Sequence, residues 1–140
     1  MTRTFIFKYI LLLVALMLAA AAVPAQNDSD QAIAIFNHGQ DLHEKGDLAG
    51  AIAEYDKALK ALPEFPEAEY QRAAAEMVLG NLAEAEASLR RATELRQDWS
   101  LAWGMLGDVL VRKYSADEAA SRPEMLKDAD AALKKALELD

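Results

Sequence analysis

The fold is decided by two consecutive stretches of 34 residues, AIAIFNHGQDLHEKGDLAGAIAEYDKALKALPEF (residues 32–65) and PEAEYQRAAAEMVLGNLAEAEASLRRATELRQDW (residues 66–99). Aligned without a gap, they match mainly at small residues: Ala34 with Ala68, Gly46 with Gly80, Ala49 with Ala83, Ala51 with Ala85, Ala53 with Ala87 and Ala58 with Ala92. Small side chains at helix crossings let two helix axes approach to the short end of about 8–10 Å. The period therefore predicts a stack of equivalent helical units.

Each unit is predicted to be a pair of antiparallel helices. Gly46 and Gly80 both follow a helical apolar pattern, at the place where a residue in the left-handed conformation ends a helix. We therefore expect helices at about 30–44, 48–61, 66–79 and 82–95. The polar residues Asn27–Asp30 are of the types that cap a helix N-terminus, and they favour a start for the first helix directly after them.

A third unit begins at Ser100, where Trp103–Leu110 reads W-x-x-L-G-x-x-L. The spacing of Ala51, Tyr55, Ala58 and Leu59 recurs at Ala129, Leu133, Ala136 and Leu137, ten residues later than a strict repeat would place it. Ser121–Glu124 is a capping box with proline in the first turn. These patterns predict helices at about 100–113 and 122–139, and the ten-residue insertion is interpreted as a longer turn plus an extension of the last helix.

The N-terminal residues differ from the repeat and predict export. Arg3 and Lys8 form a basic start to an apolar run, Tyr9–Val23, and Val23-Pro24-Ala25 has small residues at the two positions that a signal peptidase reads. The run is shorter than the about 20 residues of a spanning helix, which favours a cleaved signal over a retained anchor. We predict a signal peptide at 1–25, a linker at 26–31, and a periplasmic or secreted protein without membrane association after cleavage.

The charge of the chain limits its partners. It has 15 Lys and Arg side chains against 23 Asp and Glu, and cleavage after Ala25 would leave 13 against 23, a net charge of −10. Such a charge repels nucleic acids and anionic membranes, so basic or neutral partners are expected. Cysteine is absent, which excludes a disulfide framework, and stability must come from helix packing.

These residues resemble the tetratricopeptide repeat, a helix–turn–helix unit of 34 residues. Its small eighth position is met by Gly39, Ala73 and Gly107, and the two alanines of its second helix are met by Ala51, Ala58, Ala85, Ala92, Ala129 and Ala136. The resemblance implies an all-α fold: an α-solenoid of three repeats at 32–65, 66–99 and 100–140, forming a right-handed superhelical array.

Some positions depart from the repeat pattern. His38 stands where leucine is usual, Glu76 where the repeat has a large apolar residue, and Gln97 where proline is usual. The helix that usually covers the last pair is also missing, so Leu133, Leu137 and Leu139 are expected to lie uncovered.

The resemblance also implies a ligand surface, because the first helix of each pair lines the concave face of such arrays. Its contact positions are Ile33, Phe36, Gln40, His43 and Glu44, then Glu67, Tyr70, Ala74, Met77 and Val78, then Leu101, Gly104, Asp108, Val111 and Arg112. From these we predict that a peptide is bound by Phe36, Gln40, His43, Tyr70, Ala74, Met77, Asp108, Val111 and Arg112. In the alternative interpretation, Phe36 and Tyr70 only pack on neighbouring helices.

The sequence predicts no catalytic residue, metal site or cofactor. His43-Glu44 lacks the second histidine of a zinc motif one helical turn later. The cations of a carboxylate clamp are also missing, since Phe36, Gln40, Gln71, Leu101 and Met105 occupy its positions. The carboxylates follow the pattern of solvated outer helix faces. The leading hypothesis is an exported scaffold that binds a protein or peptide; the alternative is self-association through the uncovered last helix, and a hydrolase would require paired buried carboxylates.

Overall fold

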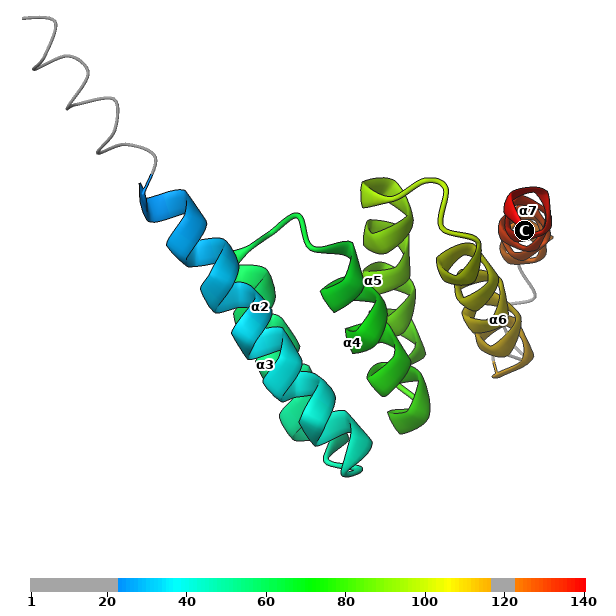
Figure 1. The fold of residues 1–140 in the computed structure, drawn as a ribbon. Coiled ribbons are helices and arrows are strands. Elements are labelled where there is room, and N and C mark those ends of the chain that lie inside the picture. Colours follow the sequence, from blue (N-terminus) through cyan, green and yellow to red (C-terminus); the bar gives the residue numbers. More distant parts are fainter. Residues whose placement is uncertain (1–22, 117–122) are drawn as a thin grey trace, which may run out of the picture.

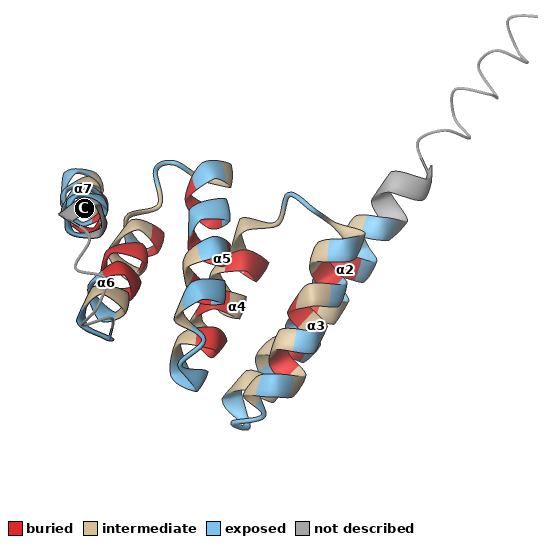
Figure 2. Cartoon of the chain, turned by 180° about the vertical axis from the view of Figure 1, so that it is seen from behind, coloured by how far each residue is buried: buried red, intermediate tan, exposed pale blue. Residues whose placement is uncertain are grey.

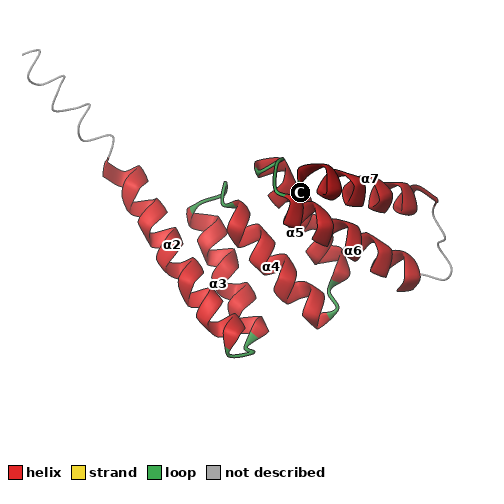
Figure 3. Ribbon diagram, turned by 45° about the vertical axis from the view of Figure 1, so that its right-hand side comes forward, coloured by secondary structure: helices red, strands yellow, loops and turns green. Residues whose placement is uncertain are grey.

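The chain folds into stacked pairs of α-helices. The computed structural model describes residues 23–116 and 123–140, and every regular element in these ranges is a helix. In chain order they are α2 (Val23–Glu44), α3 (Leu48–Ala61), α4 (Pro66–Leu79), α5 (Leu82–Leu95), α6 (Ser100–Ala116) and α7 (Pro123–Leu139). Consecutive helices pack as the pairs α2–α3, α4–α5 and α6–α7, which follow one another in a row (Figure 1, Figure 3). The predicted α-solenoid of three helix pairs is confirmed.

The first helix begins earlier than expected. α2 starts at Val23 rather than near residue 30, so the predicted start is wrong and residues 26–31 are helical. Ala25 and Gln26 have good helix propensity, and a proline in the first turn lacks only an N–H that would have no partner. Residues 1–22, which hold most of the predicted signal peptide, lie outside the described residues. In the described ranges, no helix is both long and apolar enough to cross a membrane.

The two predicted breaks between paired helices are confirmed. Gly46 and Gly80 each have φ of 81°, in the left-handed region that favours glycine. The next residue in each case donates its N–H back to the helix, with Asp47 N 2.9 Å from Leu42 O. The Asp47 side chain then caps α3 by accepting the Gly50 N–H at 2.9 Å.

The repeated small residues serve two purposes. Those at the helix crossings are buried, namely Ala51, Ala58, Ala85, Ala92 and Ala129 (Figure 2). Gly39 lies so close to α3 that a Cβ atom there would be 2.7 Å from the Tyr55 ring. In contrast, Ala49, Ala53, Ala83 and Ala87 are exposed, so these matches reflect helix propensity and not close packing.

The core has two parts. Phe36, Ala51, Tyr55, Ala58 and Ala68 form one cluster, which joins α2 and α3 to the start of α4. The other lies among α4 to α7 and consists of Ala73, Ala85, Leu89, Leu106, Val109, Leu110, Ala129 and Ala132. The contact between the first and second units is therefore less apolar than the contact between the second and third.

The insertion in the third unit lengthens its helices. α6 continues to Ala116, beyond the predicted end at 113, and α7 begins at Pro123. Residues 117–122 lie outside the described residues. Close packing within this pair is achieved at Gly107, where an added Cβ would be 2.5 Å from Leu133 Cγ.

Candidate peptide-binding groove

An open groove with a volume of about 410 Å³ lies between α4, α6 and the C-terminal end of α7. Its lining is mostly apolar: Tyr70, Met77, Leu101, Gly104, Met105, Ala136 and Leu137, with Ser100, Asp108 and Asp140 as the polar members. Leu101 is 66% exposed and Leu137 is 78% exposed. Large apolar side chains that remain this open are typical of a surface that contacts another molecule.

One wall of the groove is a fixed aromatic side chain. The Tyr70 ring lies 4.6 Å from the Trp99 ring, and the Arg96 guanidinium lies 4.6 Å from the centre of the Trp99 ring on a cation–π contact. Burial raises the pKa of Tyr70, so its hydroxyl remains protonated at neutral pH. Tyr70 also packs against the core cluster of α4 to α7. A ring that Trp99 and the core already restrain loses little entropy when a ligand packs on it.

The polar edge of the groove carries carboxylates. Asp108 lies 2.9 Å from Arg112 one helical turn later, with both side chains about half exposed. Because such exposed pairs are worth only about 0–1 kcal/mol, a ligand cation can replace Arg112 at little cost. Asp140 supplies a second carboxylate to the lining. The groove therefore combines an apolar floor with a negative edge.

The structure brings together three of the predicted site residues, Tyr70, Met77 and Asp108. Ala74 on α4 and Val111 and Arg112 on α6 do not line this groove, although Val111 is 40% exposed on the same helix as Asp108. The set also omits lining residues at Met105, Ala136, Leu137 and Asp140. Two of these four were singled out in the sequence, Met105 at a clamp position and Leu137 among the leucines expected to lie uncovered.

The predicted residues of α2 lie apart from the groove. Phe36 is only 9% exposed and packs against Tyr55 and Phe65, with ring centres 5.7 and 4.9 Å apart. The alternative interpretation, in which this ring packs on neighbouring helices, describes Phe36 correctly. Gln40 is half-buried, and His43 Nδ1 lies 3.5 Å from the Tyr55 hydroxyl.

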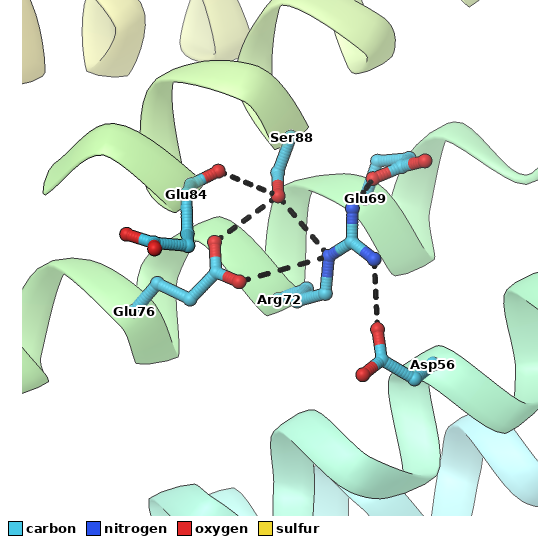
Figure 4. A network of polar contacts seen from close by, with 6 residues as sticks. All are labelled: Asp56, Glu69, Arg72, Glu76, Glu84 and Ser88. Carbon is cyan, nitrogen blue, oxygen red and sulfur yellow. Dashed lines mark hydrogen bonds and ion pairs between the residues drawn. The ribbon is translucent and has the colours of Figure 1, made fainter. Parts of the chain in front are cut away.

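A buried polar network on α4 and α5 of the second unit reaches the first unit through Asp56 (Figure 4). The Arg72 guanidinium on α4 lies 2.5 Å from Glu69, 2.8 Å from Asp56 on α3 and 3.9 Å from Glu76. Ser88 on α5 lies 3.1 Å from both Arg72 and Glu76. The prediction that the carboxylates occupy solvated faces is therefore wrong for Glu69 and Glu76, which are 7% and 6% exposed.

The electrostatics of this network indicate a structural role. Burial raises the pKa of Glu69, against the lowering effect of Arg72, and burial also raises the pKa of Glu76, against its hydrogen bond from Ser88. Glu69 accepts a hydrogen bond from Arg72 and Glu76 accepts one from Ser88, and neither carboxylate lines the groove. They are therefore not placed to act as an acid–base pair on a bound substrate. Among the described residues, no group of three or more His, Cys, Asp or Glu side chains could hold a metal ion.

Comparison with known proteins agrees with this geometry. The sequence pattern of the tetratricopeptide repeat family matches residues 42–109. The chain has the tetratricopeptide repeat fold. A solved structure described as the first TPR of Spaghetti (RPAP3) bound to HSP90 peptide SRMEEVD is 24% identical, with 80% of this chain and 81% of that chain covered and a TM-score of 0.70.

Two further structures are similar. The second TPR of Spaghetti (RPAP3), bound to the same HSP90 peptide, is 23% identical, with coverage of 84% and 100% and a TM-score of 0.71. The TPR domain of Arabidopsis OM64 is 18% identical, with coverage of 81% and 85% and a TM-score of 0.69. No curated protein matches the chain in sequence. At these identities the structural likeness concerns the fold.

Proposed function

We propose that this protein is a non-catalytic interaction module, which binds a peptide or protein segment in the groove between α4, α6 and α7. The observation that carries the proposal is the juxtaposition of Met77, Leu101 and Leu137 around one open, apolar floor beside the rigid Tyr70 ring. Two similar TPR structures have a bound peptide in their descriptions, which supports a ligand of this class.

The charge of the groove sets the proposed ligand apart from the peptide SRMEEVD that those neighbours bind. Asp108 and Asp140 are carboxylates, and the clamp positions hold Gln71, Leu101 and Met105 instead of cations. We therefore expect a segment with large apolar side chains flanked by lysine or arginine.

Two synthetic peptides with one shared apolar segment, flanked by lysines in one and glutamates in the other, test this proposal by calorimetry. The lysine-flanked peptide is expected to bind at least about tenfold more tightly at low salt, and Leu101→Glu is expected to abolish its binding. Leu79→Glu is the matched control, since Leu79 is 48% exposed on α4 but does not line the groove. Equal binding of both peptides, or binding that survives Leu101→Glu, would refute the proposal.

We also propose that the protein is exported to the periplasm or secreted. The support is the basic start, the apolar run Tyr9–Val23 and the small residues before Gln26. Mass spectrometry of the protein recovered from the envelope or medium is expected to give Gln26 as the first residue. This site is in the first turn of α2, so cleavage would shorten that helix by three residues.

A further inference from the structure

Three leucines of α7 are exposed at repeat positions that earlier units cover. Leu126, Leu133 and Leu137 are exposed by 43%, 40% and 78%. The same positions are held by Leu82, Leu89 and Thr93 in the second unit and by Leu48, Tyr55 and Leu59 in the first, and none of these six is exposed. Leu89 and Tyr55 are both fully buried. The third unit thus presents a surface, here called the α7 leucine face, that the repeat elsewhere buries.

The first helix of the following unit covers this surface in the earlier units. α4 lies against α3, and α6 lies against α5 (Figure 1). Ala68 of α4 and Ala102 of α6 hold the same repeat position and are fully buried. In α6, Leu106 and Val109 follow Ala102 by four and seven residues, and both share a core cluster with Leu89. In α4 the same two positions are held by Arg72 and Ala75, so the apolar form of this packing is that of α6: one small and then two large apolar residues on the buried face of the covering helix.

A charge pair accompanies this packing. Glu86 of α5 lies 2.6 Å from Lys113 of α6, across the junction between the second and third units. Asp130 holds the position of Glu86 in α7, on the leucine face between Leu126 and Leu133. It contacts Lys134 of its own helix at 2.7 Å, with both side chains more than 60% exposed. A cation on a covering helix could therefore reach Asp130 as Lys113 reaches Glu86.

We propose that the α7 leucine face binds an amphipathic helix of a partner protein, which takes the place that α6 takes on α5. That helix carries a small residue, large apolar residues four and seven positions later, and a lysine or arginine near the position of Lys113. A second copy of this chain does not supply it through α2, because His38 and Asp41 hold the positions of Leu106 and Val109 there and are exposed. Placing them on leucines would bury polar groups without partners.

The probe is a labelled synthetic peptide with the sequence of α6, SLAWGMLGDVLVRKYSA (residues 100–116), titrated with the full chain and followed by fluorescence anisotropy. Saturable binding is expected, and Leu126→Glu/Leu133→Glu in the protein is expected to weaken it at least about tenfold, since it places charges on the apolar contact. Leu137 belongs to both surfaces, but neither Leu126 nor Leu133 lines the groove between α4, α6 and α7, so the effect of this double variant is distinguishable from failure of the groove proposal. Leu79→Glu is the control for an exposed apolar residue elsewhere, since Leu79 is 48% exposed at the end of α4, and it is expected to have no effect.

Three further measurements keep the proposal falsifiable. Leu126→Glu alone replaces the double variant if the latter unfolds, and Lys113→Glu in the peptide is expected to weaken binding. Hydrogen exchange is expected to show new protection in α7 with α6 unchanged. Loss of protection in α6 would mean that the peptide displaces the chain's own helix, and would overturn the proposal. Unweakened binding to the leucine variants would do the same, as would sedimentation of the protein alone as a dimer that those variants dissociate.

Discussion

Replacement of Arg72 by methionine is expected to destabilise the fold severely, because Arg72 is the cation of the network between the first and second units. The substitution keeps a long apolar chain of similar length, so the change is mainly electrostatic. It leaves the Glu69 and Glu76 side chains, which are 10% and 9% exposed, in a buried site without their counter-charge. Ser88 still contacts Glu76, whereas Glu69 loses its ion pair and keeps only the longer-range attraction of Arg91.

The size of the effect follows from the burial of each contact. Removing one partner of a buried ion pair costs about 3–5 kcal/mol, because an uncompensated charge remains inside. The contact with Asp56 adds little, since Asp56 is 47% exposed and exposed pairs contribute about 0–1 kcal/mol. Arg72 is itself 22% exposed, which places the expected loss near the low end, about 3 kcal/mol. A domain of this size has only about 5–15 kcal/mol in total.

Urea unfolding followed by far-ultraviolet circular dichroism measures this loss at neutral pH. Arg112→Met is the matched control, because Arg112 is 54% exposed and its ion pair among the described residues is with the exposed Asp108. Its loss is expected to stay below about 1 kcal/mol. If Arg72→Met were no more harmful than Arg112→Met, then Arg72 would not stabilise the buried carboxylates, and the account of the network would be wrong.

Three further changes probe the same packing. Burial raises the pKa of Glu76, so the cost of ionising it in the folded state is complete above its folded-state pKa and disappears as the pH falls to the unfolded value of 4.5. Glu76→Gln removes this cost, so it should raise the urea midpoint at pH 7, and the gain should vanish near pH 4.5. Gly39→Ala should cost about 1–3 kcal/mol because its Cβ meets the fully buried Tyr55 ring, whereas Gly107→Ala meets a partly exposed leucine that can move, and the two thermal melts should differ accordingly. Leu89→Ala should cost about 2–5 kcal/mol in urea unfolding, since the side chain is fully buried.

The repeat period predicted much of the fold because it reports backbone packing directly. The bounds of α3, α4 and α5 agree with the predicted helices at 48–61, 66–79 and 82–95. Glycines with left-handed φ end the helices before them, and that requirement is visible in the sequence alone. The start of α2 was harder to predict, because the capping residues at 27–30 are also tolerated inside a helix when good helix formers precede them.

The site was harder to predict because side-chain direction depends on neighbours outside the repeat unit. Phe36 holds a position that faces ligand in the family, yet Phe65 and Tyr55 enclose its ring. Glu76 was recognised as a departure from a large apolar residue, but Ser88, which donates a hydrogen bond to its buried carboxylate, lies twelve positions further along the chain. Ala136 and Leu137 form the α7 side of the groove, with Ala136 beside Gly104, and the insertion before α7 obscured that contact in the sequence.

The junction between the first and second units and the junction between the second and third units should therefore open at different stages of unfolding. In a stack of repeats, stability is the sum of unit and neighbour terms, and each unit contacts only the next. The second and third units share one apolar cluster, whereas the first unit is joined through Ala68 and through the Asp56–Arg72 contact. Loss of Arg72 removes this contact and leaves Glu69, which lies close enough to Asp56 for their charges to interact, without its ion pair, so the perturbation is at the first junction and not at the second. Hydrogen exchange in Arg72→Met should then show α2 and α3 opening before α6 and α7, and uniform opening of all helices would indicate that the polar junction does not set the order.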